Sequence, residues 1–261
     1  MRLDVLRKRN KNLSLVLIVI IALLLICSGI TNFSLIKGVT SMPKAFTWII
    51  VNFIPNIESI SKVPSILSKL IETIFLAIAS TTVGGVCALF LSLLGSKTTM
   101  INEKLSIIAR IVASIFRNIP DAVWAMVFLL SFGQNVLTGY FALFFVSFGV
   151  LTRAFIETID ETSKESVEAL KATGASYYQI IFQGVIPASI PQMISWILYM
   201  IETNIRSSTL IGILTGTGVG FVFDLYYKSM NYPAASLVLI GIVISVFFIE
   251  FTSNYVRRVI L

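Results

Sequence analysis

The chain has no histidine, only two cysteines and few charged residues. Without histidine there is no Ser-His-Asp triad, no histidine base and no histidine-ligated metal. Cys27 and Cys87 both lie in apolar runs, so we interpret them as small buried hydrophobic residues rather than as a disulfide or a metal pair. Charged residues make up 13% of the chain, about half of the roughly 25% usual in soluble proteins. We therefore expect no catalytic residue and no metal site.

What the chain does contain is apolar sequence in long runs. Hydrophobic residues make up 56% of its 261 residues, and the mean hydropathy is +0.91. A run of about 20 apolar residues is long enough to cross a bilayer as a helix. The sequence predicts an all-α polytopic membrane protein with about six transmembrane helices. The expected spans are 13–31, 67–95, 105–132 with a break near Pro120, 136–158, 187–213 and 233–255.

The first run has an alternative interpretation as a signal peptide. It is longer than the apolar part of a typical signal, and no small-residue cleavage site follows it, so we expect a retained span. The connector 32–65 is mixed in character, contains three prolines and has room for a short interfacial helix. We expect three parts: 1–65 with the first span and this connector, 66–256 with the main transmembrane domain, and 257–261 as a cytoplasmic end.

Lysine and arginine are distributed unequally between the two ends of the predicted spans. Basic residues on the cytoplasmic side of a membrane outnumber those outside. This rule favours an inner N-terminus and an inner C-terminus, and it also accounts for the net charge of +7 without nucleic acid. The inner group would be Arg2, Arg7, Lys8, Arg9, Lys11, Lys97, Lys104, Arg110, Lys164, Lys171, Arg257 and Arg258. The outer group would be Lys37, Lys44, Lys62, Lys69 and Lys228.

The same orientation places a long polar segment, residues 162–187, in the cytoplasm. Gly174 stands near its middle, where a helix would end in a left-handed residue. Two residue pairs have the spacing of a capping box, Thr162 with Glu165 and Ser176 with Gln179. The segment therefore predicts a helix, a tight turn and a second helix, with Pro187 at the start of the next span.

The first of these two helices has an apolar stripe and a neighbouring acidic residue. Val167, Leu170 and Lys171 recur at three- and four-residue spacing on one face. We expect this face to dock in a groove of a partner, with Glu168 available for a polar contact. The alternative is an ordinary amphipathic helix at the membrane surface.

The segment resembles the EAA motif of ABC importer permease subunits. The matching residues are Glu168, Ala169, Leu170, Gly174, Ile186 and Pro187. Two positions depart from the family pattern, because Leu170 replaces the second alanine and Gly184 stands where isoleucine is usual. Three further stretches are similar to the phosphonate-type subfamily, namely 116–128, 169–192 and 202–220.

The resemblance implies a type-1 ABC importer permease fold in a bacterial plasma membrane. It implies transport of phosphonate or a related phosphorus oxyanion by alternating access, and it makes the six matching residues the ATPase-coupling site. ATP and magnesium would bind to a separate cytoplasmic ATPase, so this chain would hold no cofactor. The other implied partners are a second permease subunit, identical or related, and an extracellular substrate-binding protein.

Three alternatives to this function stay open. The chain could be a permease of the same superfamily for methionine or another organic anion. It could be a secondary transporter without an ATPase, although no convincing internal repeat is visible. An intramembrane enzyme is disfavoured by the missing histidine.

Several charged and polar residues lie inside the predicted spans. A charge at the bilayer centre costs at least about 2.5–3.5 kcal/mol, so we expect such residues to face the protein interior and to be paired. Two pairs have four-residue spacing, Arg117 with Asp121 and Glu202 with Arg206, and Asn204 lies between the second two. These residues would form either a translocation path for an anion or structural intramembrane ion pairs.

Small residues mark two further places. Ser80, Gly84, Ala88 and Ser92 repeat every fourth residue and predict a close helix seam, within this subunit rather than between two. The glycines of 216–220 do not form a nucleotide-binding fingerprint, because no strand precedes them. We expect them to allow a tight or re-entrant backbone at the outer side.

Overall fold

The computed structural model describes residues 2–31 and 33–260, and those residues form helices and no strand. The side chains of residues 2–11 and 35 are not described. Five residues of the predicted inner group therefore lie outside the described side chains: Arg2, Arg7, Lys8, Arg9 and Lys11. The chain divides into two compact units, Met1–Ile54 and Pro55–Leu261. Within the described residues, five helices are long and apolar enough to span a membrane, or six if one bent pair counts as a span. The all-α polytopic prediction is therefore confirmed.

The first unit consists of α1 (Arg2–Thr31) and α2 (Leu35–Asn52). The apolar part of α1 is exposed along its length within the unit, and Cys27 is exposed with it, so the prediction of a buried Cys27 is wrong. The expected connector 32–65 contains more helix than predicted: α2 has 18 residues, and a short helix of 4 residues, Ile57–Ile60, follows it. Ser34 caps α2 by accepting a bond from the Lys37 amide at 3.3 Å, and Pro43 is accommodated inside the helix.

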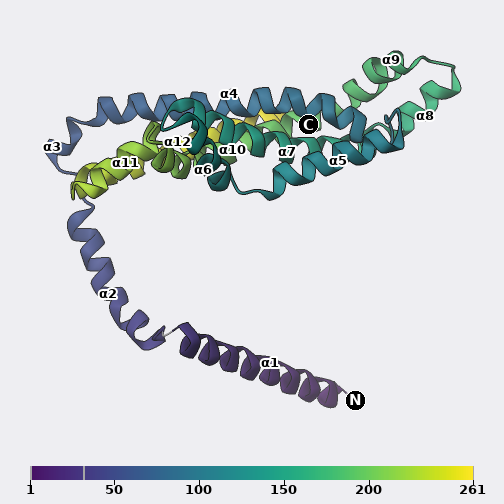
Figure 1. Cartoon of the computed structure of the whole chain (residues 1–261). Coiled ribbons are helices and arrows are strands. Elements are labelled where there is room, and N and C mark those ends of the chain that lie inside the picture. The colour runs from purple at the N-terminus through teal and green to yellow at the C-terminus, as the bar shows by residue number, and fades with distance from the viewer. Residues whose placement is uncertain (1, 32, 261) are drawn as a thin grey trace. The chain divides into compact units, whose positions relative to one another are not determined.

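The second unit is a bundle of long helices, shown in Figure 1. The four longest are α4 (Val63–Gly95), α7 (Val136–Thr162), α10 (Ile186–Thr215) and α12 (Tyr232–Ile260). α12 is helical as far as Ile260, so residues 257–260 of the expected cytoplasmic end continue this helix. The short helices α3 (Ile57–Ile60) and α11 (Gly218–Lys228) lie at one end of the bundle, opposite the segment after α7.

The predicted third span is bent sharply. It consists of α5 (Glu103–Asn118) and α6 (Asp121–Phe132), which meet at 89°. Ile119 is extended and Pro120 has no amide hydrogen, so the helix cannot continue through them. Aromatic rings fill the angle: Phe116 stacks on Trp124 and on Phe145, with centroids 5.4 and 5.0 Å apart.

The small-residue seam joins α4 to α7. Ser80, Gly84, Ala88 and Ser92 are all buried in this single chain. A Cβ on Gly84 would lie 3.2 Å from the Ser147 Cβ, so the two helices approach closely at this point. The prediction of a seam within the subunit is confirmed.

The glycines after α10 also permit close approach. Gly216 and Gly218 have φ of 70° and 62°, which favour glycine. A Cβ on Gly220 would overlap the Thr209 carbonyl oxygen, so only glycine lets α11 fold back against α10 here. The expected tight backbone is present, and the unexpected helix α11 follows it at once.

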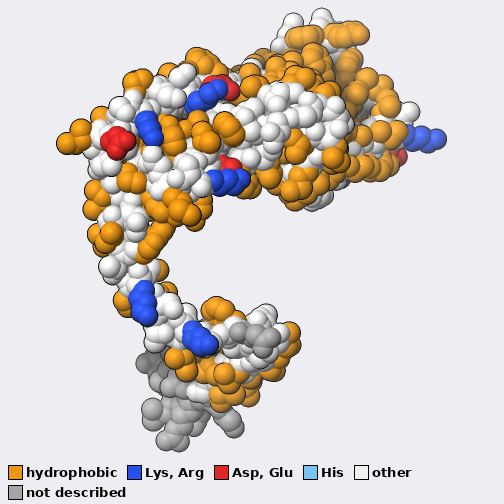
Figure 2. Space-filling view, turned by 60° about the vertical axis from the view of Figure 1, so that its left-hand side comes forward, with side chains coloured by type: hydrophobic (Ala, Val, Ile, Leu, Met, Phe, Trp, Pro, Cys, Tyr) orange, Lys and Arg blue, Asp and Glu red, His pale blue; other side chains and the backbone are white. Residues whose placement is uncertain are grey.

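The surface of the second unit is largely apolar. Figure 2 shows hydrophobic side chains over much of its visible face, with basic and acidic side chains in separate spots. Large side chains such as Phe90, Leu130 and Phe247 are more than half exposed. A surface of this kind is stable in lipid rather than in water, so the chain is a multi-pass membrane protein.

Candidate functional site

The site is built around α8 (Lys164–Ala172), a polar helix at the end of the bundle. Its C-terminus is closed by two backbone bonds, from the Gly174 amide to the Lys171 carbonyl and from the Ala175 amide to the Leu170 carbonyl, both 3.1 Å. Gly174 has φ of 79°, as its position predicted. No atom lies within 4 Å of a Cβ placed on Gly174, so backbone conformation alone requires glycine there.

The start of α8 differs from the prediction. Thr162 is the last residue of α7 rather than a helix cap, and its hydroxyl donates to the Thr158 carbonyl at 2.8 Å. Ser163 joins the two helices in nearly helical geometry, without a capping side-chain bond. The Thr162–Glu165 capping box is therefore wrong, because α7 extends one turn further than its apolar residues indicated.

The second capping box is confirmed, although the helix that follows is not separate. The Ser176 amide donates to the Gln179 side chain at 2.8 Å and starts α9 (Tyr177–Gln179). A π-helical segment, η1 (Ile180–Val185), then leads directly into α10. Pro187 is the second residue of α10, and it has no amide hydrogen to donate to the preceding π-helical turn. The turn at Gly174 is thus connected by continuous helix to a span.

The apolar stripe of α8 packs inside the chain. Val167 is only 1% exposed and lies in a cluster with Ile180, Ile181 and Val185, against which Leu170 and Ile186 also pack. The prediction that Val167 and Leu170 face a partner is therefore wrong: these side chains fix α8 to the bundle. The exposed residues of α8 include Lys164, Glu165, Glu168, Ala169 and Lys171.

The two departures from the EAA pattern meet in space. A Cβ on Gly184 would lie 2.8 Å from the Leu170 Cδ1 atom, too close for any larger residue without movement. The leucine therefore occupies the volume that the missing side chain at 184 leaves. The family pattern has isoleucine at position 184, and here Leu170 of α8 provides the hydrophobic contact instead.

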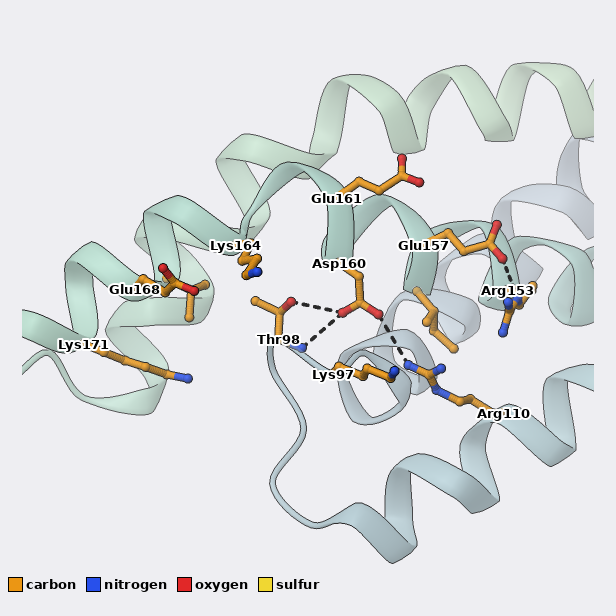
Figure 3. A pocket seen from close by; sticks show the side chains of 12 residues that line it. Lys97, Thr98, Arg110, Arg153, Glu157, Asp160, Glu161, Lys164, Glu168 and Lys171 are labelled. Atoms are coloured by element: carbon orange, nitrogen blue, oxygen red, sulfur yellow. Dashed lines mark hydrogen bonds and ion pairs between the residues drawn. The ribbon is translucent and has the colours of Figure 1, made fainter.

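A charged recess of about 540 Å³ lies between α8, α7, α5 and the turn after α4 (Figure 3). Glu168 and Lys171 reach it from α8, and Lys97 reaches it from the turn. Its size lies within the range of ligand pockets, about 300–1,000 Å³. The remaining polar lining residues are Thr98, Arg110, Arg153, Glu157, Asp160, Glu161 and Lys164.

Asp160, in the last turn of α7, accepts several hydrogen bonds in this recess. Its Oδ1 accepts from the Ser96 hydroxyl at 2.6 Å and from the Thr98 amide and hydroxyl at 3.1 and 3.0 Å. Its Oδ2 pairs with the Arg110 Nη2 at 3.4 Å (Figure 3). Sequence analysis missed Asp160, because its partners are 50 or more residues away.

A second ion pair in the recess was also missed. Arg153 Nε lies 2.6 Å from Glu157 Oε1 on α7, and both side chains are more than a third exposed. The four-residue spacing of opposite charges inside a predicted span was a signal that could have revealed it. These charges add to the polar character of the half of α7 that leads into α8.

Of the polar residues predicted within the spans, Asn204 has a structural role. It is 1% exposed, and its amide group donates to Thr81 at 2.7 Å and to Ser147 at 2.6 Å. It therefore joins α10 to α4 and α7 in this structure.

The predicted ion pairs have different outcomes. Glu202 lies 2.9 Å from Arg206, as expected, and also 4.0 Å from Arg257 of α12. Arg117 and Asp121 form no ion pair among the described residues: the bend at Pro120 separates them, and Asp121 accepts instead from the Ala122 amide at 2.8 Å. The pair does not form because the break near Pro120, which the sequence also predicted, sets α5 and α6 at 89° to each other.

The recess presents charged side chains of both signs, which can pair with a charged partner. Among the residues that the structure describes, no cluster of His, Cys, Asp and Glu is arranged to hold a metal ion. The recess offers ammonium, guanidinium and carboxylate groups, and its Thr98 hydroxyl donates to Asp160 at 3.0 Å. The site combines a short helix, α8, that has exposed charged residues with an apolar side that is packed on the bundle. Continuous helix connects the residues after α8 to the span α10.

Known proteins are similar to this chain in sequence and in fold. The chain is 28% identical over 191 residues to the phosphate-import permease protein PhnE of Mycolicibacterium smegmatis, covering 73% of this chain and 36% of that protein, so it spans about a third of that relative's length. It is 27% identical to the phosphite transport system permease protein PtxC of Stutzerimonas stutzeri, over 74% of this chain and 70% of that one. A crystal structure of an amino acid ABC transporter has the same fold, with a TM-score of 0.67 and 16% identity over 78% of this chain and 98% of that one. Residues 84–260 match the family of binding-protein-dependent transport system inner membrane components, and the chain belongs to that family.

Proposed function

We propose that this chain is the membrane-spanning permease subunit of an ATP-driven importer, and that α8 receives the movement of a separate ATPase. The observation that carries the proposal is the construction of α8. Its apolar side, at Val167 and Leu170, is fixed to the bundle, while Glu165 and Glu168 on its other side are exposed. A helix held in this way transmits force to the spans instead of yielding to it.

The partners follow from this proposal. The exposed side of α8 faces the cytoplasm if both chain ends are cytoplasmic, which the distribution of lysine and arginine supports. ATP and magnesium bind to the ATPase and not to this chain. A second permease subunit completes the path, and an extracellular binding protein delivers the solute.

The geometry suggests how movement reaches the spans. α7 runs into α8 through Ser163, and the chain after Gly174 runs through η1 into α10 without a break. A shift of α8 therefore acts on two spans together. Because Asn204 of α10 is hydrogen-bonded to α7 and α4, those spans move as a group and alternate the access of the path.

The proposed solute is a phosphonate or a related phosphorus oxyanion such as phosphite or phosphate. The names of the relatives support this class, and Arg206 offers a half-exposed guanidinium within a span for an anion to meet. Methionine or another organic anion is the alternative within the same family.

The test is reconstitution of the whole importer in liposomes. The chain is co-expressed with its ATPase and its binding protein, and uptake is measured for methylphosphonate, phosphite, phosphate and methionine. We expect ATP-dependent uptake of one of the three phosphorus compounds and stimulation of ATPase activity by the loaded binding protein. Uptake without ATP would contradict the importer proposal, while ATP-driven uptake of methionine alone would contradict only the proposed solute.

A further inference from the structure

The turn between α4 and α5, residues 96–102, is hydrogen-bonded to residues on both sides of α8. Ser96 and Thr99 are 0% and 3% exposed, although the turn lies at the end of the bundle. A buried polar turn requires partners for its hydrogen-bonding groups. The Thr99 hydroxyl donates to the Leu93 carbonyl of α4 at 2.7 Å, and other partners of the turn come from both sides of α8.

On the side before α8, Asp160 supplies the partner. One carboxylate oxygen accepts three hydrogen bonds from Ser96 and Thr98, at 2.6 to 3.1 Å. Hydrogen bonds to a carboxylate are shorter and stronger than those between neutral groups. The turn is thus fixed to the last turns of α7, immediately before α8 begins.

On the side after α8, Tyr177 supplies the second attachment. Its hydroxyl donates to the Thr99 carbonyl at 3.1 Å, across 78 residues of sequence. Tyr177 follows the Gly174 turn directly as the first residue of α9. The turn is therefore held on both sides of the helix proposed to dock with the ATPase.

The turn is also joined firmly to the spans behind it. The Gly95 carbonyl at the end of α4 accepts from the Arg110 Nε and from the Ser106 hydroxyl of α5, both at 2.8 Å. Arg110 in turn pairs with Asp160. Hydrogen bonds thus connect the α8 region to α4 and α5 as well as to α7 and α10.

We infer that Asp160 and Tyr177 are positioning residues that make α8 and the turn 96–102 move as one body. The ATPase then acts on four helices, α4, α5, α7 and α10, rather than on the two that continue from α8. This inference rests on the proposed function, because it specifies how the movement received at α8 is distributed.

The first test measures whether the body is rigid. Cys27 and Cys87 are changed to serine, spin labels are placed at the exposed positions Lys97 and Lys171, and the full chain is assembled with its ATPase in nanodiscs. We expect the interspin distance to be the same with and without trapped ATP. In Asp160→Ala the distribution should broaden. The control Glu157→Ala removes another recess ion pair on α7 that has no contact with the turn, and it should leave the distance unchanged.

The second test measures solute imported per ATP hydrolysed in liposomes. Coupling energies of this kind correspond to factors of about 5 to 150, so we expect Asp160→Ala to lower the ratio about fivefold or more while complex assembly and ATPase activity persist. Tyr177→Phe removes one hydroxyl, keeps the ring and should lower the ratio less. It serves as the test if Asp160→Ala does not assemble.

The outcomes separate this inference from the proposed function. A change in the unsubstituted protein's interspin distance on trapping ATP would overturn the inference. Unaltered transport per ATP in both Asp160→Ala and Tyr177→Phe would also overturn it, while leaving the importer proposal intact. Failure of the unsubstituted chain to form an ATP-driven importer would contradict the proposed function itself.

Discussion

Leu170 and Gly184 are complementary in shape: the Cδ1 atom of the leucine lies 2.8 Å from the position that a Cβ on the glycine would take. Each residue departs from the family's pattern at its own position. Together they keep α8 packed on η1: the larger side chain comes from α8 and the glycine from η1. The pair explains why two unusual residues coexist in an otherwise recognisable motif.

Gly184→Ile should destabilise the protein. The added side chain would overlap Leu170, and overpacking of a core typically costs about 1–3 kcal/mol. We expect a lower melting temperature of the purified permease and less complex with the ATPase. Thermal unfolding in detergent and co-purification measure the two effects.

The double variant Leu170→Ala/Gly184→Ile should recover most of this loss. It restores both residues of the family pattern and removes the overlap, so the two effects should not add. Leu170→Ala alone leaves a space and should also destabilise. Additive losses in the double variant would show that the two side chains do not share this volume.

Gly174→Ala should impair energy coupling more than folding. An L-residue in a left-handed conformation costs about 1–2 kcal/mol, and the strain falls on the turn that ends α8. Gly133→Ala is a stringent control before the other end of α7: Gly133 also has a positive φ of 71° and nothing within 4 Å of an added Cβ, and its ψ of −170° makes alanine at least as strained there. We expect both variants to assemble but only Gly174→Ala to lower solute-stimulated ATPase activity. Equal activities would argue against a special role for this turn.

Asn204→Ala should destabilise the bundle without changing solute affinity. It removes two hydrogen bonds between spans, each of which contributes about 0.6 kcal/mol on average and at most about 1.7 in membrane proteins. Thr203→Ala is the control, since its hydroxyl donates only within its own helix. A raised KM for uptake with normal stability of Asn204→Ala would instead place this residue in the path.

Glu202→Gln should destabilise more than the loss of a surface ion pair. Glu202 is 13% exposed, and its removal leaves Arg206 and Arg257 without their carboxylate. Breaking such a pair costs more than the roughly 0–1 kcal/mol of exposed pairs. Asp224→Asn breaks the more exposed pair with Lys228 and provides the comparison in thermal unfolding. Similar losses in the two variants would contradict a structural role for Glu202.

Uptake kinetics of Arg206→Gln test the alternative role of this region as a path. The Arg206 side chain is half exposed, so an anion could reach it. If it lines the path, KM for the phosphorus oxyanion should rise several-fold at normal expression. An unchanged KM would assign Arg206 to the ion pair with Glu202 alone.

The sequence predicted the parts of this fold that depend on hydropathy and local spacing. Span length, the seam at Gly84 and the turns at Gly174 and Ser176 are properties of neighbouring residues, and all were predicted. The π-helical segment Ile180–Val185 was not predicted, and α2 was expected only as a short interfacial helix within 32–65. Thr162 was misplaced because a capping-box spacing also occurs inside a continuing helix.

The candidate site was predictable only as a motif. The Glu168–Gly174–Pro187 spacing located it, while its inner construction depends on long-range contacts. The hydrogen-bond partners of Asp160 are Ser96, Thr98 and Arg110, and no local sequence pattern predicts these contacts. Val167 was assigned to a partner because an apolar stripe does not say which surface covers it.

The most direct test of the account is to identify what α8 touches. A benzophenone is attached at Glu165→Cys in a chain without native cysteines, which leaves Glu168 intact, and at Leu137→Cys as a control in the first turn of α7, about 40 Å away along a helix of 27 residues. Both positions are exposed. After illumination of membranes that contain the complete importer, the account predicts an adduct with the ATPase from position 165 and none from 137. An ATPase adduct absent from 165, with the complex assembled, would contradict it.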